Sequence, residues 1–164
     1  MKKIFIFLFV VFLTNSNATE GIYFIDVDYL FKNSNYGKQI ISKLEDFNKK
    51  NISELKIKEK ELNDLENLIS KQKNIISTDE LNNKVENLKI KIAAYKEDKE
   101  KKISGFNKLK NNELNNFFKE ISPLLEEFMK KNSIKILFDR KNIFIADSKY
   151  DITIKILEYL DKNL

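Results

Sequence analysis

The chain has 164 residues, with 30 basic and 25 acidic residues, a formal net charge of +5, and neither cysteine nor histidine. Without these two residue types, disulfides, thiol nucleophiles and the usual histidine-dependent triads are excluded, and no metal-ligand set is recognisable. The mild basic excess is spread among acidic residues, which argues against a nucleic-acid-binding face. We therefore expect neither an enzyme nor a cofactor-binding, metal-binding or nucleic-acid-binding protein.

Residues 1–18 have the pattern of a cleavable secretory signal peptide. Two lysines precede a continuous apolar run at residues 4–13, and a small-residue cleavage pattern ends at Ala18. The alternative is an uncleaved membrane anchor, but a run of about ten residues is half of the roughly twenty that span a bilayer. We expect the mature protein to be exported and soluble.

The next segment, residues 21–29 (GIYFIDVDY), is rich in aromatic and β-branched residues. It predicts a strand with two largely apolar faces, ended by turn residues at 33–37. From Lys38 the pattern becomes helical. One column of residues seven apart is apolar in all but one place, whereas a second is only half apolar, which predicts a loosely packed seam. The apolar column comprises Ile41, Leu55, Leu62, Ile69 and Ile76.

A polar break at residues 77–80 separates this helix from a second one. Any of Ser77, Thr78 or Asp79 is a suitable N-cap for the second helix. Pro123 is expected to kink that helix or to begin a new segment, because proline removes an internal hydrogen bond. Together, residues 37–131 predict an antiparallel helical hairpin about 50 Å long.

The last part of the chain predicts a strand, a turn, a second strand and a final helix. Residues 134–138 and 143–145 are strand-like, and Asp151 is a suitable N-cap for the helix. With the first strand they lie at the two feet of the hairpin. The expected fold is α+β: a small sheet from residues 19–36 and 132–164, with the helical arm inserted between its strands.

Such a base is too small to be stable alone. About fifty residues without disulfides or metals rarely supply more than a few kcal/mol. We expect several chains to close a shared barrel, which removes exposed strand edges; the alternative is that the strands fold back on the arm. The residues expected in this oligomeric base are Ile22, Phe24, Ile25, Ile136, Phe138, Ile143 and Ile145.

The chain resembles the Skp (OmpH-like) periplasmic chaperones of Gram-negative bacteria. The resemblance lies in the signal peptide, the opening IYFIDVDYLF, the SNYGK that leads into the first helix, and the closing FDRKNIFIAD and DIT. It implies a homotrimer with a small central barrel and three helical hairpins around a cavity. It also implies an ATP-independent periplasmic holdase for unfolded outer-membrane proteins.

Capture of such clients would be non-covalent, through apolar surface along the arm. For each candidate residue the alternative is a place in the seam between the two helices. A structural spacer or adaptor of the cell envelope is the alternative function. Three lysines near the tip are candidates for contact with anionic lipid or acidic clients: Lys71, Lys73 and Lys84. The alternative is that these lysines only make the tip polar and solvated. The candidate client-binding residues are Leu55, Leu62, Leu65, Ile69, Leu88, Ile92 and Tyr95.

Overall fold

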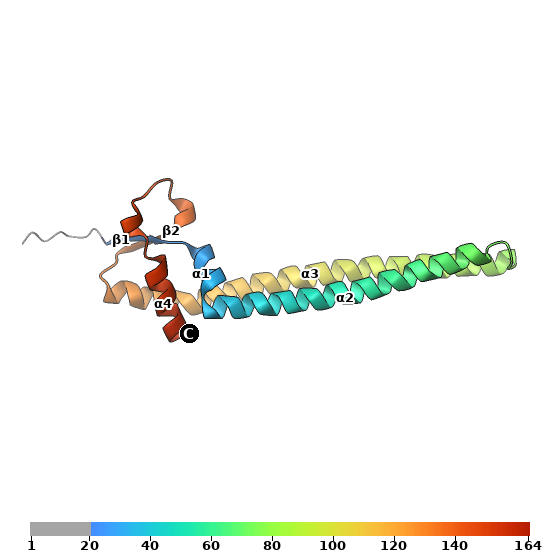
Figure 1. Ribbon diagram of the computed structural model, residues 1–164, viewed down its shortest axis with the longest axis horizontal. Helices are drawn as coiled ribbons and strands as arrows, with labels where there is room; N and C mark the ends of the chain where they lie inside the picture. Colours follow the sequence, from blue (N-terminus) through green and yellow to red (C-terminus); the bar gives the residue numbers. More distant parts are fainter. Residues whose placement is uncertain (1–20) are drawn as a thin grey trace, which may run out of the picture.

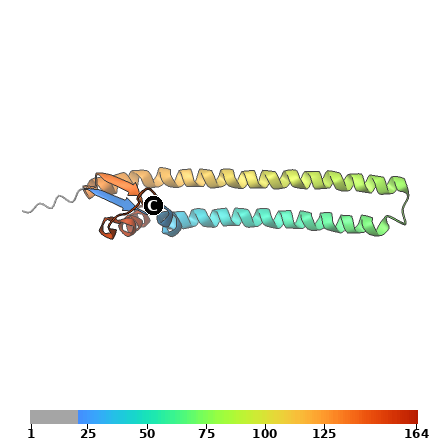
Figure 2. The ribbon, with the colours of Figure 1, turned by 90° about the horizontal axis from the view of Figure 1, so that it is seen from above.

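Two long antiparallel helices form an arm that projects in one direction from a small base (Figures 1 and 2). The computed structural model describes residues 21–164, so the predicted signal peptide lies outside the described residues. The arm consists of α2 (Asn35–Gln72) and α3 (Thr78–Lys131), joined by a short turn at the far end. The predicted α+β fold, with a helical arm inserted between terminal strands, is confirmed.

The first strand, β1, is shorter than predicted. It covers Ile22–Ile25, and α1 (Val27–Asn33) follows it. The prediction of a strand as far as residue 29 is therefore wrong. The reason lies in Asp26, whose Oδ1 accepts a hydrogen bond from the backbone N–H of Tyr29 at 2.8 Å. This side-chain cap satisfies a free donor of the first helical turn and outweighs the strand preference of the apolar residues around it.

Serine caps begin both helices of the arm. Ser34, which is fully buried, accepts a hydrogen bond from the N–H of Gly37 at 3.1 Å and starts α2. Ser77 accepts from the N–H of Glu80 at 3.3 Å and starts α3, which confirms the predicted break. Pro123 does not begin a new segment, because α3 continues to Lys131. Since Pro123 is exposed, water can replace the hydrogen bond that it removes.

The sheet has two parallel strands, β1 and β2 (Ile136–Asp139), with Ile22 opposite Ile136 and Ile25 opposite Asp139. The parallel direction follows from the lengths of the arm helices. The 54 residues of α3 exceed the 38 of α2, so α3 runs past the start of α2 and beneath the sheet (Figure 1). The chain then reverses at Ser133, which has a φ of 56°, and β2 returns beside β1.

The predicted strand at residues 143–145 is wrong. β2 is followed by two 3₁₀ turns, η1 (Arg140–Asn142) and η2 (Ser148–Tyr150), and the residues between them are irregular. Asp139 begins η1 by accepting a hydrogen bond from the N–H of Lys141 at 3.2 Å. This local bond turns the chain away from the sheet. The described sheet therefore has two strands and not three.

The last helix, α4 (Thr153–Asn163), packs against β1, α1 and α3. Asp151 lies one position before the N-cap, Ile152, so its predicted position is wrong by one residue. Its Oδ1 still accepts from the N–H of Thr153 at 2.9 Å. Thr153 Oγ1 in turn accepts from the N–H of Asp26 at 2.8 Å, which ties α4 to the start of α1. The core of the base comprises Ile25, Leu30, Ile40, Phe117, Ile121, Ile134, Ile152, Ile156 and Leu160.

Candidate functional site

Three ion pairs connect the two helices of the arm and define their register. From one pair to the next toward the tip, the residue number rises along α2 by as much as it falls along α3. The helices are therefore aligned without a slip from the base to the middle of the arm. The pairs are Lys43–Glu113 (2.6 Å), Glu54–Lys102 (2.5 Å) and Lys58–Asp98 (2.8 Å).

Continued toward the tip, this register places the predicted client-binding residues opposite one another. Leu62 faces Tyr95, and the two line one shallow pocket; Ile69, which is only 7% exposed, lies at the level of Leu88. Leu55, Leu65 and Ile92 are half-buried in the same way. The structure thus brings six of the seven residues together as the apolar part of the seam, whereas Leu55 lies nearer the base, at the level of Lys102. Their burial stabilises the arm and leaves little of their surface for a client.

A second set of apolar side chains on the arm is more than a third exposed, and sequence reasoning did not identify it as a candidate client surface. These residues lie outside the seven-residue columns, and that position was the only signal for them in the sequence. They are spread from the foot of the arm to its tip. We call them the exposed arm set: Phe47 (38% exposed), Ile52 (45%), Ile57 (57%), Leu68 (47%), Ile75 (81%), Ile90 (59%) and Ile103 (52%).

Two ion pairs of the middle arm shift the pKa values of three of their members, Glu54, Asp98 and Lys102. The hydrogen bond from the Lys102 ammonium lowers the pKa of the Glu54 carboxyl below its ordinary 4.5. The hydrogen bond from Lys58 likewise lowers the pKa of Asp98 below 3.8, and the bond to Glu54 raises the pKa of Lys102 above 10.5. All of these groups are therefore charged in the folded arm at neutral pH.

These shifts predict that acid weakens the arm. A carboxyl whose pKa is lowered by folding contributes stability above its ordinary pKa, and that stability is lost as the pH falls through the folded value. Thermal unfolding followed by circular dichroism should show a lower Tm at about pH 3 than at pH 7. In the double variant Glu54→Gln and Asp98→Asn this loss should be smaller. An equal loss in the double variant would contradict the assignment.

The tip of the arm carries lysines in two different states. Lys71 and Lys73 are exposed, whereas Lys84 Nζ lies 2.8 Å from Gln72 Oε1 and 3.1 Å from Glu80 Oε1. Lys84 is therefore held within the tip, and two of the three predicted basic residues are presented to solvent. Ile75, in the turn between the helices, is the most exposed apolar residue of the arm. Contact of this tip with anionic lipid or acidic clients stays a prediction.

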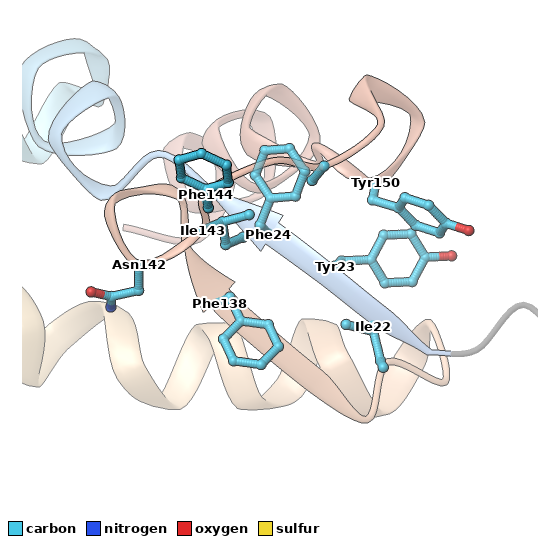
Figure 3. A pocket seen from close by; sticks show the side chains of 9 residues that line it. Ile22, Tyr23, Phe24, Phe138, Asn142, Ile143, Phe144 and Tyr150 are labelled. Atoms are coloured by element: carbon cyan, nitrogen blue, oxygen red, sulfur yellow. The ribbon is translucent and has the colours of Figure 1, made fainter.

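The base presents an apolar patch on the outer side of its sheet. We call the five side chains Ile22, Ile136, Phe138, Phe144 and Ile145 the base patch; Phe144 and Ile145 are 103% and 85% exposed. Beside the patch is an open pocket of about 450 Å³. In Figure 3, aromatic rings surround this pocket, with Tyr23 and Tyr150 side by side; their ring centroids are 6.1 Å apart.

Most of the predicted base residues belong to the patch or to the pocket beside it. Ile143 is half-buried and lines the pocket, as does Phe24, which is 7% exposed. Ile25 is the exception, since it is 3% exposed and lies in the core of its own chain. Within residues 21–164, no strand pairs with the outer edge of β2.

Salt bridges hold the start of the loop that carries Phe144 and Ile145. Lys141 Nζ lies 2.7 Å from Asp28 Oδ1, and this contact lowers the pKa of Asp28. The Arg140 guanidinium lies 4.0 Å from Asp26 and 3.9 Å from Asp151.

Among the described residues, no cluster of acidic side chains is arranged to hold a metal ion. None of the helices in residues 21–164 is both long and apolar enough to cross a membrane.

Comparison with known proteins gives one family and one fold. The family profile described as outer membrane protein (OmpH-like) matches residues 21–160. The crystal structure of an OmpH-like protein from Caulobacter crescentus CB15, assigned as an outer membrane chaperone, superimposes with a TM-score of 0.80 at 18% identity. The match covers 88% of this chain and 85% of that one. No curated protein sequence matches the chain. With a profile that matches most of its length, the chain belongs to the OmpH-like outer membrane protein family.

Proposed function

We propose that the protein is an ATP-independent holdase chaperone of the periplasm that keeps unfolded outer-membrane proteins from aggregating. The observation that carries this proposal is the exposed arm set, in which seven large apolar side chains are spread along the whole arm. Membership of the OmpH-like family and the fold shared with a protein assigned as a chaperone support it. The signal peptide predicted at residues 1–18 supports export.

The spacing of the exposed arm set suits an unfolded client better than a folded one. Each apolar contact is worth roughly 25 cal/mol for every Å² removed from water, so a single half-exposed isoleucine binds weakly. Many weak contacts distributed over a long arm can hold an extended chain without fixing its conformation. A folded partner would instead favour one continuous apolar patch.

We further propose that three copies assemble through the base patch, with their arms around a shared client cavity. A patch that includes Phe144 and Ile145, almost completely exposed, is costly in a free monomer. The unpaired outer edge of β2 offers backbone hydrogen bonds to a second copy. In such an assembly, residues 143–145 could pair as the strand that their sequence favours.

Suppression of aggregation tests the chaperone proposal. A urea-unfolded outer-membrane β-barrel protein is diluted into buffer with the purified protein, without nucleotide, and light scattering is recorded. We expect near-stoichiometric trimer to keep the client soluble. If the client scatters as much light with the protein as it does in buffer without it, and the protein binds one folded envelope protein tightly, the result would instead support a spacer or adaptor.

Replacing three members of the exposed arm set should weaken capture while the fold is retained. Ile57, Ile90 and Ile103 are each more than half exposed, so their change to serine removes little of the core. We expect the concentration needed to suppress scattering to rise about tenfold, which corresponds to about 1.4 kcal/mol. The matched control changes three exposed polar residues of the arm, Asn63, Asn82 and Asn107, to serine. Equal capture by both triple variants would exclude the exposed arm set as the client surface.

A further inference from the structure

The seam of the arm changes character along its length. Toward the tip, from residue 62 of α2 and as far as residue 95 of α3, it is formed by apolar residues, of which Ile69 is the most buried. Toward the base, residues 43–58 of α2 meet residues 98–113 of α3, and polar or charged side chains enter the seam. We call these two parts the apolar seam and the charged seam.

In parts of the charged seam, an apolar residue faces a polar one. The register places Leu55 at the level of Lys102, whose side chain is 16% exposed and reaches Glu54. Glu113 is 9% exposed, and its carboxylate depends on Lys43 for a partner. Asp98 forms an ion pair with Lys58, and the nearby charge of Lys102 also contributes to lowering the pKa of Asp98. All three ion pairs that cross between the helices of the described arm lie in this segment.

One member of each pair is largely exposed to water, so these pairs do not hold the helices as firmly as apolar packing does. Lys43, Lys58 and Glu54 have side-chain exposures of 61%, 49% and 41%. Ion pairs of this kind contribute little and are screened by salt. The rings of Phe47 and Phe106 stack across this segment. Their centroids are 6.5 Å apart, so this aromatic contact is loose and adds limited support.

We propose that the charged seam is the compliant segment of the arm, in which α2 and α3 separate as ionic strength rises while the apolar seam stays closed. The reason is that ions weaken the cross-seam pairs, whereas salt does not screen apolar contacts. The arm then widens in its middle and keeps a joined tip. This property belongs to the free protein and requires no client.

Distances between paired spin labels on the full mature chain test this proposal. Because the chain has no cysteine, introduced cysteines are the sole labelling sites. Ser53→Cys with Ser104→Cys places exposed labels within one turn of the Glu54–Lys102 pair, in the charged seam. Ser70→Cys with Asn87→Cys places exposed labels beside the apolar seam.

Distances are measured by pulsed electron resonance, with labelled chains diluted into unlabelled protein so that only pairs within one chain contribute. As salt rises from about 0.01 M to about 1 M, the screening length falls from about 30 Å to about 3 Å. We expect the separated population of the Ser53–Ser104 pair to increase about fivefold. The Ser70–Asn87 distribution should stay unchanged. An unchanged Ser53–Ser104 distribution, or equal widening of both pairs, would overturn the proposal.

Charge variants provide an independent test at low salt. Asp98→Lys places a lysine beside Lys58 and should widen the Ser53–Ser104 distribution, and adding Lys58→Glu should restore it. The matched control is Lys60→Glu, because the 2.6 Å pair of Lys60 with Asp64 lies within α2 and does not cross the seam. If Lys60→Glu also widens the Ser53–Ser104 distribution, or if adding Lys58→Glu does not restore it, the effect comes from overall charge and not from the cross-seam pair.

Discussion

Phe138→Glu should convert the proposed trimer into monomers. Phe138 lies on the edge strand β2, is 43% exposed, and is absent from the core of its own chain. A carboxylate in the centre of the proposed interface would be buried without a partner in every copy. A penalty of about 3 kcal/mol corresponds to roughly a hundredfold weaker association.

Sedimentation equilibrium at micromolar concentration measures this change as a fall from trimer to monomer mass. Phe144→Glu should have the same effect, and because Phe144 is fully exposed, its substitution cannot disturb the monomer core. Ile103→Glu is the matched control, since Ile103 is 52% exposed but lies on the arm, and its variant should remain trimeric. Unchanged trimer mass in both phenylalanine variants would remove the base patch as the assembly surface.

Gly37→Ala should cause the largest loss of stability among the alanine variants of the three glycines in the described chain. At Gly37 the first turn of α2 approaches the end of α1 so closely that an added Cβ would lie 1.8 Å from the carbonyl oxygen of Phe31. It would also lie 2.9 Å from Ser34 Oγ, the capping atom of α2. Because the first of these neighbours is backbone, α1 has to move away from α2.

We expect Gly37→Ala to lower the free energy of unfolding by about 3 kcal/mol, measured by urea denaturation. Gly105→Ala is the matched control, since nothing lies within 4 Å of a Cβ added there, in the middle of α3. Alanine is the better helix former, so this variant should gain up to about 1 kcal/mol. Equal effects at the two glycines would show that the approach of α1 to α2 does not limit stability.

The arm was predictable because its signals are local and repeated. A column of apolar residues seven apart and a polar break with a suitable serine specify two helices and their connection. Ser77 is the cap, as the sequence allowed. Pro123 shows the limit of such rules, because one missing hydrogen bond on an exposed face does not end a 54-residue helix.

The base was less predictable because short apolar segments satisfy more than one structure. Residues 27–29 and 143–145 both have strand-like composition, yet aspartate side chains before them bind backbone N–H groups and begin helical turns. Asp26 accepts from the N–H group three residues on, and Asp139 accepts from the N–H group two residues on. Strand preference depends on a neighbouring strand, and within residues 21–164 neither segment has one.

The candidate surfaces required the three-dimensional register. Sequence spacing identifies apolar residues on a helix, but it does not say which of them a partner helix covers. Leu62 and Tyr95 are covered, whereas Ile57 and Ile90, a few positions away, are more than half exposed. The ion pairs that distinguish these groups join residues 40 to 70 positions apart in the chain, so a single sequence does not reveal them.

The pairing of Ile22 with Ile136 also determines the order in which the molecule can form. Neighbouring turns of the arm are close in the chain and can associate early, whereas β1 has to await a strand made more than a hundred residues later. In the newly made chain, the helical arm can therefore form before the sheet of the base. Until β2 forms, β1 has no partner strand, so the incomplete chain exposes the backbone N–H and C=O groups of an apolar strand edge.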